Sequence, residues 1–253
     1  MKYLQTEGLV TGSRSYSEAD KLLTLFTLEK GKVPAIAKGA CKTKSKLAAS
    51  VQLFTRADFQ LYMGKTLATV TQGEIKTSFY SLRYDLTNYA YGQYFCELVN
   101  RLLEEKEPFP EVYQLLLTVF EVLKNTELDM ELLARSFELK LLSILGYRPY
   151  LDECLVCSRE SDFYRFSYQE GGILCAECSL GSPGSQKINL GTLSIIKKLL
   201  STKYSRLNIL KVSPSQKKEI LLINKKLLNY NVNLGSCKSL VFLEELGALP
   251  KVT

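Results

Sequence analysis

Hydrophobic and polar residues alternate in short runs near the start of the chain. Each run is rich in β-branched and aromatic residues, and segments rich in Gly, Ser and Lys separate the runs, which cover residues 3–12, 21–28, 32–38, 53–62 and 66–78. Five short strands in so few residues predict a small closed barrel. Its most economical form is the five-stranded OB-fold, whose open face and loops often hold oligonucleotides.

Beyond residue 79 the apolar period becomes helical. Apolar residues recur three and four positions apart in three stripes, which start at Tyr91, Val112 and Leu132 and predict at least three helices with one buried face each. Further along, residues 193–200 and 214–228 predict two more helices, both basic.

Helix boundaries are marked by residues with defined local preferences. Pro108 and Pro110 separate the first helix from the second, and Asp129 is a suitable cap for the third. Gly146 suits the end of that third helix. In the last basic helix Pro214 fits the first turn, with Ser213 as its cap.

Two Cys-x-x-Cys motifs follow the third predicted helix. They comprise Cys154 with Cys157 and Cys175 with Cys178, in a chain that contains no histidine. This spacing is typical of a zinc ribbon, in which four thiolates bind one structural ion and leave no position open for water or substrate. We therefore expect one structural Zn²⁺ per chain, with a strand and a Gly171-Gly172 turn between the motifs.

Other uses of these cysteines are a disulfide pair or a redox dithiol. No signal peptide opens the chain, and no apolar run approaches the ~20 residues of a membrane span, so we expect a cytoplasmic protein without a membrane partner. Structural disulfides are rare in that compartment, and a redox dithiol would use one motif rather than two. Cys41, Cys96 and Cys237 are isolated and are expected to be unpaired thiols.

These patterns predict an α+β multidomain chain. We expect an OB-fold β-barrel over residues 1–78 and an α-helical domain over residues 79–253, with a four-cysteine zinc ribbon inserted at about 150–182. The composition, 46% hydrophobic and 23% charged, is ordinary for a globular protein with a real core.

The net charge of +7 is unevenly distributed. Six lysines and no acid lie between residues 30 and 46, the middle of the chain is acidic, and basic residues return between 187 and 226. Nucleic acid would be attracted to the two basic segments, because neutralising its phosphates releases counterions. The alternative for the second segment is an ordinary solvated lysine face.

The absence of histidine excludes several common enzyme mechanisms, including Ser-His-Asp triads and His-liganded catalytic zinc. Gly64-Lys65-Thr66 resembles the end of a phosphate-binding loop, but Phe59 stands where that loop needs its first glycine. No compact acidic cluster lies in the basic segments. We therefore expect a protein that is not an enzyme.

Several segments together resemble one family. Residues 17–27, Gly31-Lys32-Val33, residues 37–40 and residues 71–74 are similar to the N-terminal domain of RecO, the bacterial recombination mediator. Residues 145–149, which lead into the first cysteine motif, resemble the same family. The resemblance implies a protein that binds single- and double-stranded DNA and anneals complementary strands. It also implies partners: RecR, the C-terminal tail of SSB and, functionally, RecA, in the cytoplasm near the nucleoid.

The family's basic loop after the third strand corresponds to residues 38–46, here named the lysine loop. Its expected DNA contacts are Lys38, Lys42, Lys44 and Lys46, with Arg14 as a further candidate in the turn before the second strand. Cys41 stands where the family commonly has a basic residue, which removes one charge. Aromatic residues that could stack on bases are Phe54, Phe59 and Tyr62, although we expect two of the three to pack in the barrel core instead.

Two other functions stay open at this point. One is an interaction scaffold whose basic faces recruit acidic protein tails, with DNA contact incidental. The other is a ribbon-bearing RNA-processing enzyme.

Overall fold

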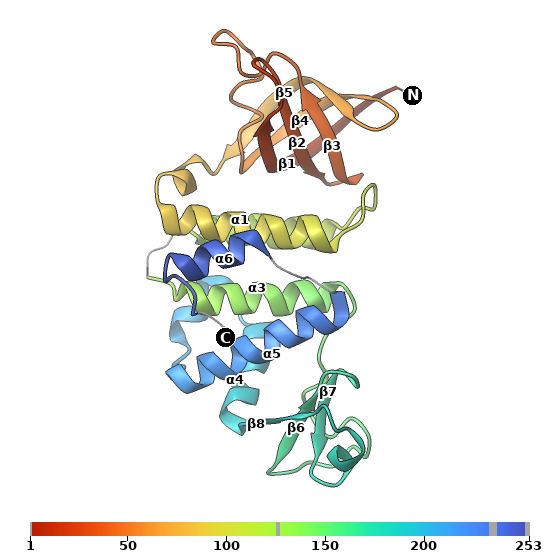
Figure 1. Ribbon diagram of the computed structural model, residues 1–253, viewed down its shortest axis with the longest axis vertical. Helices are drawn as coiled ribbons and strands as arrows, with labels where there is room; N and C mark the ends of the chain where they lie inside the picture. The colour runs from red at the N-terminus through yellow and green to blue at the C-terminus, as the bar shows by residue number, and fades with distance from the viewer. Residues whose placement is uncertain (1, 125–126, 233–236, 251–253) are drawn as a thin grey trace. The chain divides into compact units, whose positions relative to one another are not determined.

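The computed structural model describes residues 2–124, 127–232 and 237–250, and is shown in Figure 1. The strands are β1 (Tyr3–Ser15), β2 (Lys21–Thr27), β3 (Gly31–Ala37), β4 (Thr55–Met63), β5 (Ala68–Ser78), β6 (Tyr164–Ser167), β7 (Gly172–Cys175) and β8 (Gln186–Ile188). The α-helices are α1 (Leu86–Leu102), α2 (Pro110–Val122), α3 (Met130–Ile144), α4 (Leu190–Ser201), α5 (Pro214–Val232) and α6 (Lys238–Glu245). Short 3-10 helices are η1 (Tyr80–Arg83), η2 (Cys178–Gly181) and η3 (Tyr204–Ile209).

Packing divides the chain into two compact units. The first unit comprises Met1–Lys124 and Cys237–Leu246, and the second comprises Asn125–Ser236 and Gly247–Thr253. The boundary expected at residues 78 and 79 marks the change from strands to helices, whereas the first unit also takes in α1, α2 and α6. Because the compact units and the expected domains are divided by different criteria, the domain limits 1–78 and 79–253 stay a prediction.

The first five strands close into a barrel in the order β1-β2-β3-β5-β4. All neighbouring pairs are antiparallel except β3 and β5, where Ala35 pairs with Ala68 and Ile36 with Thr69. This order, with one parallel pair closing the barrel, is that of an OB-fold. The α+β fold class, with an OB-type barrel before a helical region, is confirmed.

Alternation of burial along the strands fills the barrel. In β4, Ala57, Phe59 and Leu61 point inward and are fully buried, while the residues between them are partly exposed. Phe59 is therefore a core residue and offers no ring to a nucleic acid.

Phe54 is also buried, between the barrel and the helices of the first unit. Its ring lies 5.1 Å from that of Phe120 in α2 and 5.9 Å from that of Tyr89 in α1, both in edge-on geometry. A side chain at Gly92 in α1 would come within 2.8 Å of the Phe54 ring, so glycine allows this close approach. Of the three aromatics that could have stacked on bases, Phe54 and Phe59 are core residues, and only Tyr62 is partly exposed.

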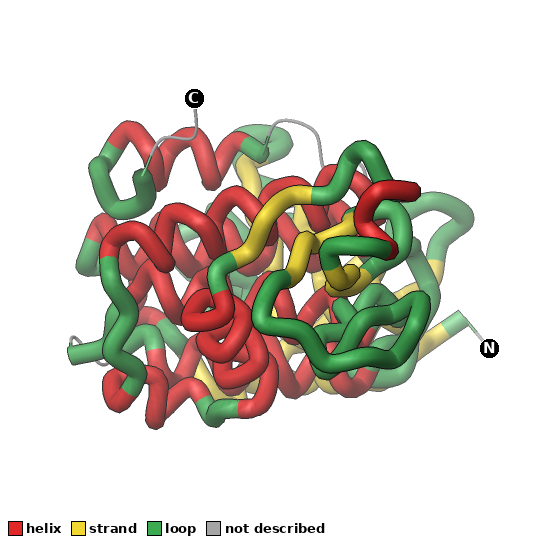
Figure 2. Tube along the Cα trace, turned by 90° about the horizontal axis from the view of Figure 1, so that it is seen from below, coloured by secondary structure: helices red, strands yellow, loops and turns green. Residues whose placement is uncertain are grey.

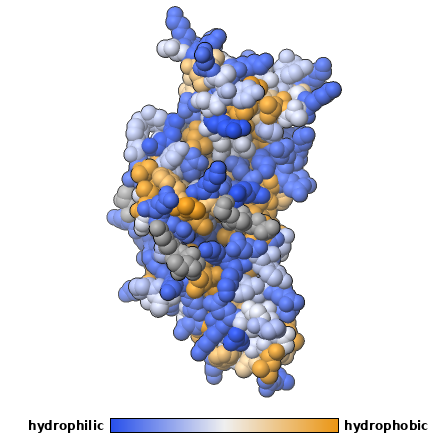
Figure 3. Space-filling view, viewed as in Figure 1, coloured by the Kyte–Doolittle hydropathy of each residue, from blue (hydrophilic) through white to orange (hydrophobic). Residues whose placement is uncertain are grey.

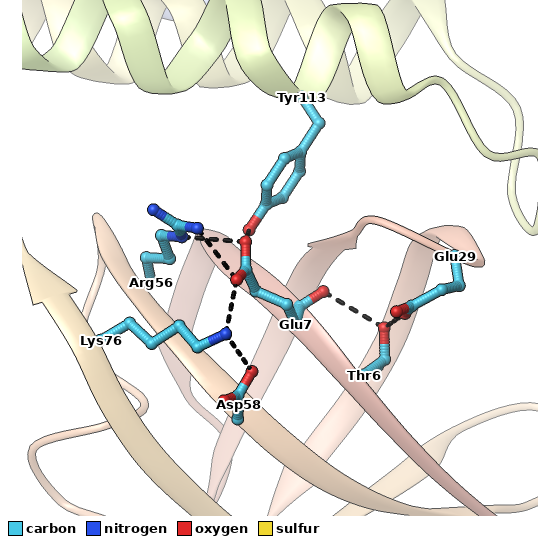
Figure 4. A network of polar contacts seen from close by, with 7 residues as sticks. All are labelled: Thr6, Glu7, Glu29, Arg56, Asp58, Lys76 and Tyr113. Carbon is cyan, nitrogen blue, oxygen red and sulfur yellow. Dashed lines mark hydrogen bonds and ion pairs between the residues drawn. The ribbon is translucent and has the colours of Figure 1, made fainter.

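A second link between barrel and helices is polar (Figure 4). The Glu7 carboxylate in β1 accepts two hydrogen bonds of 2.9 Å from the guanidinium of Arg56 in β4. It accepts another of 2.8 Å from Lys76 in β5, whose ammonium also pairs with Asp58 at 3.0 Å. The Tyr113 hydroxyl of α2 completes this set of donors.

Helix α6 packs against α1 although they are far apart in the sequence (Figure 1). The residue before α6, Cys237, makes no capping bond through its side chain. Instead the Glu97 carboxylate in α1 accepts hydrogen bonds from the backbone N–H groups of Lys238 at 3.2 Å and Ser239 at 2.8 Å. An acid from another helix thus satisfies free N–H groups at the start of α6.

The helices of the second unit surround a buried polar contact. Arg135 and Glu138 in α3 form an ion pair of 3.0 Å, and both side chains are almost fully buried. Asn224 in α5 donates hydrogen bonds to the Glu138 carboxylate at 2.9 Å and to the Arg135 carbonyl at 3.0 Å. This contact fixes α5 against α3.

Helix boundaries agree with the residues that predicted them. The Asp129 carboxylate accepts a hydrogen bond of 3.1 Å from the Leu132 N–H and caps α3. At the other end Gly146 has a φ of 89°, which suits a residue that ends a helix in the left-handed region. The Ser213 hydroxyl accepts a hydrogen bond of 3.3 Å from the Gln216 N–H at the start of α5.

The segment after α3 consists mostly of loops with short strands, as Figure 2 shows in green and yellow. Strand β6 pairs with β7 on one side and β8 on the other. The predicted strand between the cysteine motifs is confirmed as β6, whereas β8 and α6 gave no recognised signal in the sequence. None of the helices in residues 2–124, 127–232 and 237–250 has the length and apolarity needed to cross a membrane.

Candidate metal centre and nucleic-acid interface

The first cysteine motif lies in a tight turn. The Ser158 N–H donates a hydrogen bond of 2.8 Å to the Cys154 carbonyl, and the Cys154 N–H donates one of 3.1 Å to the Arg159 carbonyl. Ser158 adopts a φ of 53°, which reverses the chain directly after Cys157. The turn is tied to β7 through the Leu155 N–H, which donates to the Ile173 carbonyl at 2.9 Å.

The second motif is positioned by the hairpin of β6 and β7. Cys175 is the last residue of β7, where it pairs with Tyr164, and Cys178 begins η2. Gly172 at the start of β7 forms a bridge with Tyr150, and a side chain there would come within 2.6 Å of the Tyr150 carbonyl oxygen. Glycine at this position lets the chain before the first motif lie against the hairpin.

The four sulfur atoms of Cys154, Cys157, Cys175 and Cys178 lie within 4.8 Å of one another. The Sγ atoms of Cys157 and Cys175 are 3.8 Å apart. A tetrahedral ion with Zn–S bonds of about 2.3 Å separates its sulfur ligands by about 3.8 Å, so the cluster fits a four-thiolate metal site. No other group of three or more metal-binding side chains is found among residues 2–124, 127–232 and 237–250.

Local hydrogen bonding favours thiolate at the most buried of these residues. Burial acts to raise the pKa of the Cys154 thiol, but backbone N–H groups of Cys175 and Cys157 outweigh it and lower the pKa to about 6. Thiolate is the form that binds a metal ion, so the end of β7 and the turn of the first motif together prepare this residue as a ligand.

The lysine loop leaves β3 at one end of the barrel. Strand register places Arg14 of β1 opposite Leu22 of β2, and Leu22 opposite Ile36 of β3. Arg14 therefore lies at the same barrel end as the start of the loop, at the end of β1 rather than in the turn after it. The loop start is held by the Asp20 carboxylate, which accepts a hydrogen bond of 2.8 Å from the Gly39 N–H.

All four lysines of the loop are exposed: Lys38, Lys42, Lys44 and Lys46. In the part of the chain that the structure describes, none of them takes part in an ion pair. Arg14 is likewise exposed and forms no ion pair there. Figure 3 shows hydrophilic side chains, in blue, projecting from the barrel on the face in view.

Other basic residues are committed to internal contacts. The Lys32 ammonium donates hydrogen bonds of 2.7 Å to the carbonyls of Asn100 and Leu103 at the end of α1. In the C-terminal basic segment Lys197 pairs with Asp152 at 3.1 Å, and Lys217 pairs with Asp129. Charge in the second basic segment is therefore partly neutralised, whereas charge in the lysine loop faces solvent.

These features define an OB-fold protein with a helical region and an inserted four-cysteine metal site. The family model described as Recombination protein O N terminal matches residues 1–79, and the one described as Recombination protein O C terminal matches residues 83–240. The chain belongs to the RecO family.

Relatives named DNA repair protein RecO cover most of the chain. The protein of Alkaliphilus metalliredigens is 40% identical over 212 residues, which are 83% of this chain and 86% of the relative. That of Pelotomaculum thermopropionicum is 37% identical over 251 residues, 99% of this chain and 97% of the relative. The resemblance seen in the sequence is therefore confirmed.

Proposed function

We propose that this chain is a DNA-binding mediator of recombinational repair that catalyses no reaction of its own. It binds single- and double-stranded DNA, anneals complementary single strands and, with RecR, helps to load RecA on single strands coated by SSB. It acts in the bacterial cytoplasm, associated with the nucleoid. Membership of a family whose members are named DNA repair proteins supports the proposal.

The observation that carries the proposal is the exposed lysine loop on the OB-fold barrel. Four ammonium groups project from residues 38–46 without ion pairs among the described residues. Ammonium groups of this kind bind phosphates without reading bases. A mediator must accept any strand, so contacts that ignore sequence suit the task.

The four cysteines serve this function indirectly. A Zn²⁺ ion bound by Cys154, Cys157, Cys175 and Cys178 would hold the turns around β6 and β7 together, since these short strands bury little apolar surface. Four thiolate ligands leave no open coordination position, so the ion would supply folding energy and no hydrolysis.

One observation favours the second function, recruitment of acidic protein tails. A groove of about 710 Å³ lies beside α5, where Leu221 and Leu222 supply apolar walls and Lys218 supplies an exposed positive charge. Glu131 also lines the groove, and its carboxylate, 3.6 Å from the Lys217 ammonium, offsets part of the positive charge there. We therefore rank this function below DNA binding and assign no residues to SSB.

The lysine loop is tested by replacing Lys42, Lys44 and Lys46 together with Ala. Binding of fluorescent single strands of several sequences, measured by anisotropy at several salt concentrations, should weaken equally for all sequences. The slope of log affinity against log salt should fall by up to about 2 units, at about 0.7 for each phosphate that the variant no longer neutralises. Replacement of the same lysines with Arg keeps the charge and should keep the slope.

An unchanged slope in the Ala variant would reject the lysine loop as the DNA contact. Mediator activity is tested separately, by annealing of labelled complementary strands with and without SSB. Failure of the protein to accelerate annealing under both conditions would reject that part of the proposal.

A further inference from the structure

Two exposed tyrosines follow the last strand of the barrel. The side chains of Tyr80 in η1 and Tyr84 just after it are 47% and 74% exposed. Their rings are in edge-on contact, with centroids 4.7 Å apart and planes at 88°. Pairs of large rings are more often buried than displayed to water, so this pair is a candidate for contact with a ligand.

Arg83 lies between the two tyrosines in the sequence and adds a cation to the cluster. Its guanidinium carbon lies 4.3 Å from the centre of the Tyr80 ring, and its Nη1 donates a hydrogen bond of 3.1 Å to Gln52. The Nε atom is buried and has no hydrogen-bond partner among the described residues. The cluster therefore holds a positive charge beside the Tyr80 ring, which in turn contacts Tyr84.

An open groove of about 560 Å³ adjoins this cluster. Residues shortly after the lysine loop, Ala48, Ala49 and Gln52, line one part, and Ile75, Tyr80 and Arg83 line the other. Ala48 comes only two residues after Lys46, so the groove continues from the lysine loop within the first unit.

We propose that this groove is a base-stacking site for single-stranded nucleic acid. An unpaired base in the groove lies against Tyr80, which lines it, and a neighbouring base stacks on the more exposed Tyr84 ring beside the groove. Arg83 attracts the strand by its charge. Neighbouring phosphates reach the lysine loop. This inference rests on the proposed DNA binding. It adds a contact that favours a single strand over a duplex, because the bases of a duplex are already stacked on one another and cannot stack on the tyrosines.

The charges nearby fit a nucleic acid better than an acidic protein. A protein tail would supply carboxylates for Arg83 but has no general need of two exposed rings, whereas every base has a face that stacks on an aromatic side chain. The adjacent acid Asp85 is engaged at the start of α1, where its carboxylate accepts a hydrogen bond of 2.7 Å from the Asn88 N–H.

The test compares an oligothymidylate with an oligonucleotide of equal length that carries abasic spacers. Replacing Tyr80 and Tyr84 with Ala should weaken binding of the oligothymidylate about fivefold or more, the loss expected for one base–aromatic stack. Binding of the abasic strand and the salt slope should not change, because tyrosine carries no charge. A 2-aminopurine base in the strand should lose less fluorescence on binding the variant than on binding the original protein.

Two controls separate stacking from damage to the fold. The Tyr80→Phe and Tyr84→Phe double variant keeps both rings and should bind like the original protein. Tyr3→Ala removes another exposed ring of the barrel, 60% exposed and paired edge-on with Tyr62, and should not affect binding. Thermal unfolding followed by circular dichroism checks that each variant is folded.

Equal losses for the thymidylate and abasic strands, or the same loss in Tyr3→Ala, would overturn the stacking site. An unaltered affinity in the double Ala variant would reject it while leaving the lysine loop standing, provided that the Lys variants still lower the salt slope. If the original protein binds neither strand at low salt, the DNA-binding proposal and this inference both fail.

Discussion

The Tyr113 hydroxyl in α2 donates a hydrogen bond of 3.0 Å to the Glu7 carboxylate in β1. This bond joins a strand of the barrel to a helix of the same unit, at a carboxylate that also binds Arg56 and Lys76. Burial acts to raise the pKa of Glu7, but hydrogen bonds from these three partners outweigh it and lower the pKa from 4.5 to about 2. The ionised form is therefore favoured by folding.

The lowered pKa of Glu7 should make the stability of the protein depend on pH. A carboxyl with a lowered pKa stabilises the folded state fully above pH 4.5 and progressively less as the pH falls to about 2. Glu7→Gln should lower the free energy of unfolding by about 2 kcal/mol at pH 7, and the difference should shrink toward pH 2. Urea unfolding of both proteins at several pH values measures this difference in the free energy of unfolding. Asp58→Asn, which affects only an exposed pair with Lys76, should cost less than about 1 kcal/mol.

Metal binding should depend on each of the four clustered thiols. We expect one equivalent of zinc per chain by elemental analysis, and a substantial loss of bound zinc in Cys154→Ser. Cys41→Ser, which changes an exposed thiol of the lysine loop, should keep its zinc. A thiol-competing chelator should loosen the segment around β6 and β7, as measured by amide hydrogen exchange. Full zinc content in Cys154→Ser would contradict the assignment of this ligand.

The ion pair of Arg135 and Glu138 should be costly to break from one side. Arg135→Met leaves the Glu138 carboxylate buried without the guanidinium charge that balances it. This change should lower the free energy of unfolding by about 3–5 kcal/mol. Replacing both residues, as Arg135→Met with Glu138→Leu, removes both charges and should cost less than the single change. Denaturant unfolding of the three proteins decides between these outcomes. A double variant less stable than the single one would show that the pair is itself strongly stabilising.

Lysines with acidic partners should matter less for DNA than those of the lysine loop. Replacing Lys197 and Lys217 with Ala removes charges that already pair with Asp152 and Asp129. We expect a salt slope within about 0.5 units of the original, because these two ammonium groups neutralise few phosphates. Anisotropy titrations beside the lysine-loop variant provide the comparison. A fall as large as in that variant would place the second basic segment in the DNA interface.

Local signals in the sequence were sufficient for much of the fold. Asp129 and Gly146 fix the ends of α3 through bonds and angles within a few residues of themselves. The cysteine spacing likewise predicted a cluster, because two tight turns joined by a hairpin bring the four sulfur atoms close together. Period-two burial was equally informative for strands such as β4.

Features that depend on distant residues were not predictable in this way. Nothing near Lys238 in the sequence reveals that α6 packs on α1 or that Glu97 caps it. The Glu7 network joins residues from three strands and a helix, so its members look like ordinary surface charges in the sequence. Tyr80 and Tyr84 offered a faint signal, two rings four residues apart after a strand, but only exposure distinguishes them from core residues.

The position of α6 gives the chain an order of assembly. Glu97 and Lys238 are separated by 141 positions, and the intervening polypeptide contains most of the second unit. During synthesis the ribosome therefore releases the barrel and α1 long before the helix that covers α1 exists. Until then one flank of α1 is bare, so a nascent or prematurely terminated product would expose it to chaperones and proteases.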